Sequence, residues 1–301
     1  MNTQSNVTPE SFDSHRITPA VLSPTRPFYW SVRRELWEYR SIYIAPLAVA
    51  AVTLFGFLIA TIGRAMSVHD PARRAGVLED SNGFAALMIM GTAFVVGVFY
   101  CLEALHGERR DRSILFWKSL PVSDLTTVLS KATIPLVVLT LLSFVITVVL
   151  QFIMLLLSSA VLLGTGMSVA PLWTQASFFQ MSMMLLYHLF AVHALWYSPI
   201  YGWLLLVSSW ARRAAFLWAA LPFFAIGIVE KIAFGTAHFV GLLQYRLSGP
   251  EAYTLTARGG DAMSTVDPVS FLATPGLWIG LALAAAFLAG AVRMRRYQGP
   301  I

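Results

Sequence analysis

Charged residues are scarce in this sequence. Asp, Glu, Lys and Arg make up 12% of its 301 residues, whereas hydrophobic residues make up 57%, and the mean hydropathy is +0.68. A soluble globular domain carries about a quarter charged residues. The composition therefore excludes a soluble domain and predicts a polytopic membrane protein of the all-α class, with the lipid bilayer as its surroundings.

Cysteine, lysine and the common catalytic motifs are also scarce or missing. Cys101 stands alone within an apolar run, which excludes an intrachain disulfide and a redox motif. None of the lysines Lys118, Lys131 and Lys231 follows a glycine, so the chain has no phosphate-binding loop of an ATPase. Gly-x-Ser-x-Gly and His-Glu-x-x-His are missing too. We therefore expect no catalysis, no metal site and no cofactor in this chain.

Six membrane-spanning helices are predicted from the stretches that lack charge. The uncharged stretch 132–211 is too long for one crossing of about 20 residues, and its polar middle at 164–176 divides it in two. A kink is expected near Pro199, and Pro222 makes a bent or re-entrant fifth element an alternative. The predicted spans lie near 41–62, 83–105, 132–163, 177–209, 214–235 and 273–292.

The orientation follows from the distribution of Lys and Arg. With the N-terminus inside, the inner segments hold 15 of these residues and the outer loops hold six. This bias predicts that both termini are cytoplasmic in an integral plasma membrane protein, most simply of a bacterial inner membrane. Because the basic residues flank apolar runs and form no single stripe, the charge of +6 does not indicate nucleic-acid binding.

Several segments outside the predicted spans can be assigned from their composition. Residues 1–27 are polar and are predicted to be a disordered cytoplasmic tail, and 28–40 is predicted to be an interfacial helix leading into the membrane. Residues 28–301 then form a single transmembrane domain. Residues 63–82 and 236–272 are expected to be outer loops.

Four ionisable residues near or within the spans leave alternatives open. His188 and His193, five residues apart in an α-helix and so roughly 140° around its axis, are most simply satisfied polar groups of the bundle interior. A haem or other redox role is the alternative. Glu103 and Glu230 are most simply interfacial residues, and a proton-coupled secondary transporter that uses them is the alternative.

The segment 106–123, HGERRDRSILFWKSLPVS, is the densest charged patch of the chain. Apolar residues follow the charges at once, and four of them in the cytoplasm need a cover. Pro121 is expected to end a short helix, and Ser123 with Asp124 to cap the next one. We therefore predict an elbow of two helices over 106–131, with an apolar tip, that joins the second and third spans.

The segment 103–131, together with six spans and an interfacial helix, resembles the permease subunit of type 2 ATP-binding-cassette (ABC) exporters. The short apolar helix between the second and third spans is similar to their coupling helix. The resemblance implies a homodimeric or heterodimeric permease driven by separate ATPase subunits, which would hold ATP and Mg²⁺. It implies export, and it carries over no substrate-binding residue.

On this resemblance we expect the elbow to contact the ATPase through an apolar core and a polar rim. The expected core is Ile114, Leu115, Phe116 and Trp117. The expected rim and flanking contacts are Glu103, Glu108, Arg109, Arg110, Arg112 and Lys118.

Overall fold

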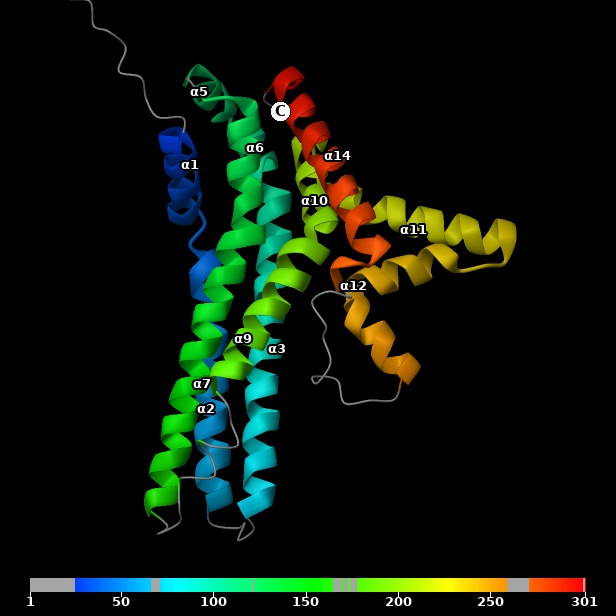
Figure 1. The fold of residues 1–301 in the computed structure, drawn as a ribbon. Helices are drawn as coiled ribbons and strands as arrows, with labels where there is room; N and C mark the ends of the chain where they lie inside the picture. The colour runs from blue at the N-terminus through cyan, green and yellow to red at the C-terminus, as the bar shows by residue number, and fades with distance from the viewer. Residues whose placement is uncertain are drawn as a thin grey trace, which may run out of the picture.

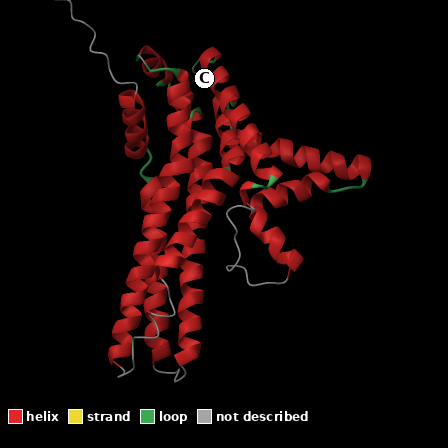
Figure 2. Cartoon of the chain, viewed as in Figure 1, coloured by secondary structure: helices red, strands yellow, loops and turns green. Residues whose placement is uncertain are grey.

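The computed structural model describes residues 25–65, 71–120, 122–164, 169, 173, 178–258, 271–299 and 301. Over these residues the chain is helical, with short loops and no strand (Figure 2). The predicted tail 1–27 lies almost entirely outside the described residues. The all-α class is confirmed.

The helices follow one another with few residues between them. In chain order they are α1 (Thr25–Glu38), α2 (Ser41–Ala65), α3 (Pro71–Ala104), α4 (His106–Arg110), α5 (Ile114–Ser119), α6 (Asp124–Thr133), the π-helix η1 (Ile134–Val138), α7 (Leu139–Gly164), α9 (Phe178–His188), the π-helix η2 (Leu189–Trp196), α10 (Ser198–Trp210), α11 (Ala215–Phe234), α12 (His238–Arg258) and α14 (Pro275–Tyr297).

Among the described residues, five helices are long and apolar enough to cross a membrane. They are Ser41–Thr61, Asn82–Arg110, Asp124–Gly164, Ala215–Phe234 and Pro275–Tyr297. The bent pair Met181–Trp196 and Ser198–Trp210, with an angle of 41° between its parts, gives a sixth if it is counted as one span. The chain is therefore a helical membrane protein, and the expected kink lies two residues before Pro199, at Tyr197.

Two segments that were expected to be loops are largely helical. α3 begins at Pro71, inside the expected loop 63–82, and α12 occupies much of the expected loop 236–272. Gly249 interrupts α12 with φ 81° and ψ 161°, a conformation that only glycine adopts easily. Polar residues misled the prediction here, because a helix tolerates them outside its apolar face.

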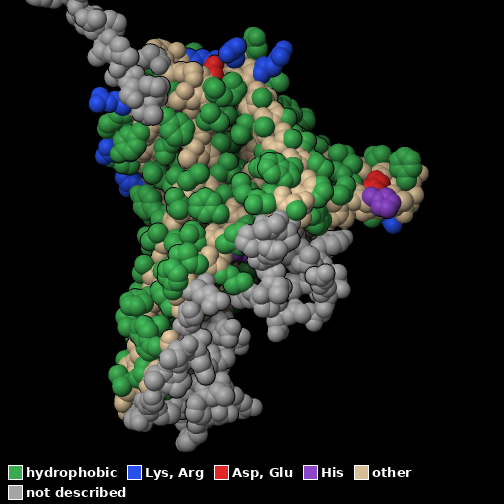
Figure 3. All heavy atoms as spheres, in the orientation of Figure 1, with side chains coloured by type: hydrophobic (Ala, Val, Ile, Leu, Met, Phe, Trp, Pro, Cys, Tyr) green, Lys and Arg blue, Asp and Glu red, His purple; other side chains and the backbone are tan. Residues whose placement is uncertain are grey.

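The long helices α2, α3 and α7 run side by side, and α9, η2 and α10 together cross them (Figure 1). α14 lies along α10, while α11 and α12 project sideways from the bundle. Among the described atoms that are visible in Figure 3, hydrophobic side chains cover most of the face outside the end that carries α5, where Lys and Arg side chains gather. An apolar outer face is what contact with lipid requires.

The largest apolar core lies at the end of the bundle that carries α5. Ile42 of α2, Tyr100 of α3, Val128 of α6 and Leu205 of α10 are all at most 4% exposed within it. Because these residues come from four helices, the core fixes the position of the helix ends at which the charged segment 106–123 lies.

Candidate functional site

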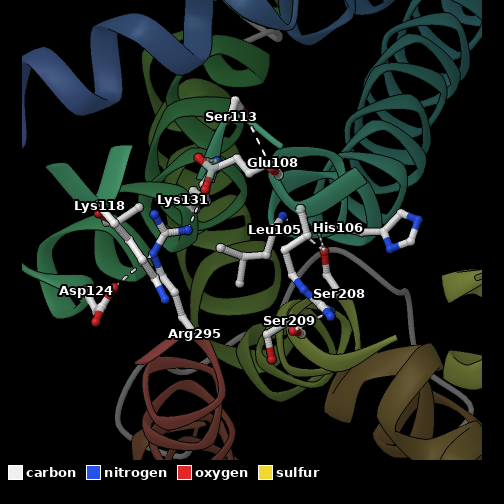
Figure 4. A network of polar contacts seen from close by, with 12 residues as sticks. Leu105, His106, Glu108, Ser113, Lys118, Asp124, Lys131, Ser208, Ser209 and Arg295 are labelled. Atoms are coloured by element: carbon white, nitrogen blue, oxygen red, sulfur yellow. Dashed lines mark hydrogen bonds and ion pairs between the residues drawn. The ribbon is translucent and has the colours of Figure 1, made fainter. Parts of the chain in front are cut away.

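The charged segment 106–123 meets the ends of several other helices at one end of the bundle, which we call the network end (Figure 4). α4 continues α3 after a single residue, Leu105, and α5 follows α4 after a short turn. α1, α6, α10 and α14 all bring side chains or backbone carbonyls to this place.

Glu108 of α4 is the centre of this arrangement. Its side chain is buried and contacts three cations from three different helices. Arg34 Nη2 lies 2.9 Å from Glu108 Oε1, Lys131 Nζ lies 3.1 Å from the same oxygen, and Arg295 Nη1 pairs with Oε2. Glu108 therefore ties α4 to α1, α6 and α14.

Glu35 of α1 is the second buried carboxylate. Lys131 Nζ donates to its Oε1 at 2.8 Å, and Tyr100 Oη donates to its Oε2 at 2.9 Å. The exposed fractions of Glu35 and Lys131 are both 1%. A charge buried this deeply is tolerated only when it is paired and hydrogen-bonded, as both are here.

Arg295 of α14 closes the arrangement, because its Nε also lies 3.2 Å from Asp124 Oδ1 at the start of α6. We call the connected residues the charge network: Arg34, Glu35, Glu108, Asp124, Lys131 and Arg295. These six residues are three acids and three bases, and the exposed carboxylate of Glu38 lies 3.6 Å from Arg34 Nε at the edge of the network. Burial works against the charge of Arg34, but Glu35 and Glu108 outweigh it and raise the pKa of Arg34 above its ordinary value.

Arg109 points to the other side of α4 and binds backbone carbonyls. Its Nη1 donates to the carbonyls of Ser209 at 2.8 Å and Ala211 at 3.2 Å, where α10 ends. Its Nε donates to Gly299 at 3.3 Å, beyond the end of α14. A cation at the C-terminal end of a helix satisfies carbonyls that have no partner within the helix.

Ser208 joins α10 to the start of α4. Its hydroxyl accepts hydrogen bonds from the backbone N–H groups of Leu105 and His106, at 3.1 Å and 2.8 Å, and donates to the carbonyl of Leu102 at 2.8 Å. His106 Nδ1 lies 3.1 Å from the carbonyl of Ala211. α4 is thus bound to α10 by hydrogen bonds as well as to the charge network by ion pairs.

α5 has a buried side, a covered side and an exposed side. Ile114 is 1% exposed, whereas Leu115 and Phe116 are each 59% exposed. The Arg34 guanidinium lies 3.8 Å from the centre of the Trp117 ring, and Lys118 Nζ donates to the carbonyl of Gln298 at 3.1 Å. α5 is therefore held from both sides and presents two apolar side chains outward.

The end of the elbow agrees with the prediction where it is described. Ser123 accepts a hydrogen bond from the N–H of Thr126 at 3.1 Å and caps α6, and α5 ends at Ser119. Pro121, which was expected to end the short helix, lies outside the described residues.

The structure divides the expected contact residues into two groups. Glu108, Arg109 and Ile114 lie inside the protein. The expectation of Glu108 and Arg109 as surface rim residues therefore does not hold, nor does that of Ile114 as part of the apolar contact core. Arg110, Arg112, Leu115, Phe116 and Lys118 are exposed, and Glu103 and Trp117 are partly exposed. Glu103 Oε1 pairs with Arg110 Nη2 at 2.8 Å, the simpler of its two predicted roles.

The sequence reasoning missed the inward role of Glu35, Lys131 and Arg295. A signal was present, because Lys131 directly precedes the long uncharged stretch and Glu35 lies in the first amphipathic helix. The sequence positions of Lys131 and Glu35 do not by themselves indicate that these two side chains form an ion pair.

The remaining ionisable candidates have local structural partners. Glu230 accepts hydrogen bonds from the N–H groups of His238 and Phe239, at 2.7 Å and 2.9 Å, and so caps α12. His193 is 6% exposed and makes an edge contact with Tyr197. The expected angle of 140° to His188 assumed an α-helix, whereas the π-helix η2 brings residues five apart toward one face.

Among the described residues, no three His, Cys, Asp or Glu side chains lie close enough together to hold a metal ion. What distinguishes the network end is instead a buried set of charges that supports a short helix with an apolar tip. No protein-family model, curated protein or solved structure matches this chain.

Proposed function

We propose that this chain is the membrane-spanning permease subunit of an ABC exporter, with ATP hydrolysis on a separate soluble subunit. The observation that carries the proposal is α5, a short helix outside the spans with Leu115 and Phe116 exposed and its other sides fixed. Two adjacent exposed apolar side chains at a polar end of a membrane protein favour a protein partner. The resemblance of 103–131 to a coupling helix supplies the kind of partner.

The mechanism we propose is a push on α5 that the charge network distributes. α5 is joined to α1 by Arg34 over Trp117, and Arg34 pairs with Glu108 of α4. Glu108 in turn contacts Lys131 of α6 and Arg295 of α14. Closure of two ATPase subunits on ATP would then shift four helix ends together and alternate the access of the transport path.

Site-directed crosslinking tests the placement of the ATPase. In a chain with Cys101→Ala, the variants Phe116→Cys and Phe84→Cys carry a thiol-linked photocrosslinker in native membranes. Phe116 and Phe84 are 59% and 58% exposed, but Phe84 lies on α3 away from the network end, so it is a matched control. We expect Phe116→Cys, and not Phe84→Cys, to crosslink to a soluble protein that has a phosphate-binding loop and hydrolyses ATP.

Two outcomes would contradict the proposal. If neither variant crosslinks to an ATPase although the chain is folded and intact, the proposed ATP-driven function is wrong. If both positions crosslink equally to an ATPase, α5 is not the element to which the ATPase binds.

The strength of the contact can be measured once the ATPase is in hand. Phe116→Asp should weaken its binding by about 2 kcal/mol or more, roughly 30-fold in Kd, as for a central apolar contact residue. Phe116→Leu, which keeps an apolar side chain, is the control and should bind nearly as the unchanged chain does. The affinity is measured on the purified permease in lipid nanodiscs.

A further inference from the structure

A line of buried polar residues runs along α7, away from the charge network. The exposed fractions of its members lie between 0% and 5%, and spacings of three, four, four and seven residues place them on one helix face. They extend for about 27 Å along the axis at roughly 1.5 Å per residue. We call this line the polar seam: Thr140, Ser143, Thr147, Gln151 and Ser158.

Four members of the polar seam have a side-chain oxygen that is buried and makes no hydrogen bond within the described structure. These atoms are Ser143 Oγ, Thr147 Oγ1, Gln151 Oε1 and Ser158 Oγ. Thr140 differs, because it donates to the carbonyl of Leu136 at 3.0 Å.

Hydroxyl groups elsewhere in the helices behave differently. Thr53, Thr61 and Ser182 each donate to the carbonyl four residues earlier, at 2.7–2.8 Å. Ser159, the neighbour of Ser158 on α7, does the same. Backbone bonding is thus the usual arrangement in this chain, and three successive hydroxyls of the polar seam depart from it.

A buried polar group without a partner costs about 1–3 kcal/mol, and native proteins have few of them. Four on one face of one helix therefore indicate a partner that comes from outside the chain. No Asp, Glu, Lys or Arg occurs in 132–211, which contains the whole seam. Hydroxyl and amide groups without a nearby charge suit water and uncharged hydrogen-bonding groups better than ions.

The helices around the polar seam are suited to opening it. α7 packs against α2, α3, α9 and η2, and η1, which directly precedes α7, also contacts η2. η1 and η2 are π-helices, whose hydrogen bonding differs from that of the α-helices around them, and such segments recur at functional sites. The bend of 41° at the end of η2 is a further irregular point in an element that contacts α7.

We propose that the polar seam is a path for water and for the uncharged hydrogen-bonding groups of the transported solute, exposed when η2 moves away from α7. The assignment to a solute rests on the transport function proposed above, whereas the access of water does not. The solute class is a neutral molecule, or an amphiphile with a neutral head group, rich in hydroxyl or amide groups.

Thiol accessibility in membranes tests the path without any ATPase. In the Cys101→Ala chain, single cysteines at Ser143, Thr147 or Ser158 are treated with hydroxyethyl methanethiosulfonate, a small neutral reagent. The cysteine thiolate attacks its thiosulfonate sulfur, which forms a mixed disulfide and releases methanesulfinate. Val145 and Val149, 54% and 51% exposed on the outer face of α7, are the controls at matched depth.

We expect the seam cysteines to react about tenfold faster or more than the controls. Only the thiolate reacts, and each pKa unit by which apolar surroundings raise the pKa of a thiol lowers the thiolate fraction about tenfold. Rates at the seam as slow as at Val145 and Val149, with and without ATP, would overturn the proposal. If the seam cysteines react in a chain that binds no ATPase, the proposed water path is supported and only the proposed ATP-driven function is contradicted.

A second variant guards against a purely structural role for the seam. The double change Ser143→Ala and Thr147→Val removes two hydroxyls without partners and keeps the volume. It should leave the Tm unchanged or higher, and it should slow the modification of a cysteine at Ser158 by about tenfold, as the path loses water. A clear fall in Tm would show that these hydroxyls have partners in the folded chain, and would also overturn the proposal.

Discussion

Arg112 holds a backbone conformation that residues with a side chain adopt rarely. Its φ is 58°, in the left-handed region, and it forms the turn from α4 to α5. For an L-residue this region costs about 1–2 kcal/mol. The turn persists because Glu108 and Arg109 fix one side of it and Ile114 fixes the other. The direction in which α5 presents Leu115 and Phe116 therefore depends on one strained residue.

Substitutions at Arg112 should separate this strain from the charge. Arg112→Gly should leave stability unchanged or raise it by up to about 1 kcal/mol, because glycine adopts positive φ freely. Arg112→Val should lower stability by about 1–2 kcal/mol, since a β-branched residue fits this region worst. Thermal unfolding of the purified protein in detergent measures both changes.

Arg110→Val serves as the control, because Arg110 is an exposed residue with helical backbone. A loss at Arg112→Val no larger than at Arg110→Val would mean that the turn carries no strain.

At the scale of elements, contacts with the charge network and with α10 explain why the short helix α4, to which α5 is joined, keeps its place. Helices this short have little stability of their own. Contacts from α1, α6 and α14 to Glu108, and from α10 to Arg109, replace it. These contacts are worth much only as a complete set, because a buried charge that loses its partner is strongly destabilising.

Removal of one cation from the network should therefore cost far more than removal of a surface pair. Lys131→Met leaves Glu35 and Glu108 with fewer partners in a buried place and should lower stability by about 3–5 kcal/mol. Glu103→Gln breaks the exposed pair with Arg110 and should cost at most about 1 kcal/mol. Unfolding followed by tryptophan fluorescence in detergent compares them, and equal losses would contradict the role given to burial.

The elements were predictable to different degrees. Runs without charge located the five apolar helices and the bent pair among the described residues, and Ser123 marked the start of α6, because both depend on local sequence. The burial of Glu108 was not predictable, since it depends on Lys131 and Arg295 from distant segments. The burial of Arg109 depends in the same way on backbone carbonyls at the end of α10. Alternation of charged and apolar residues indicates an interface with water, but it does not tell which charges turn inward.

The same limit applies to α11 and α12. Pro222 indicated an irregular fifth element, whereas the segment around Gly249 was expected to be a loop and instead forms α12, which Gly249 interrupts. The outward projection of this pair depends on contacts between helices and has no mark in the sequence. The two π-helices are a further case, because their neighbours around α7 decide how the backbone winds.

At the scale of the whole molecule, the distribution of Lys and Arg predicts which end faces the cytoplasm. In the Cys101→Ala chain, a cysteine at Phe116 should react with a membrane-impermeant maleimide in inside-out vesicles and be protected in right-side-out vesicles. A cysteine at Leu163, 67% exposed at the far end of α7, should show the opposite pattern. Labelling of both from the same side would contradict the predicted topology.

The charge network also sets an order of events during biosynthesis. Glu108 and Arg295 are 187 residues apart, so the ribosome makes one of the three cations around Glu108 only when it reaches α14. Until α14 has inserted, Glu108 lacks one of its three cations, and Asp124 at the start of α6 lacks its ion pair with Arg295. A chain interrupted before α14 would leave Glu108 with Arg34 and Lys131 alone and would leave Asp124 without the Arg295 guanidinium. The charges at this end of the bundle are therefore balanced only after α14 has been made and inserted.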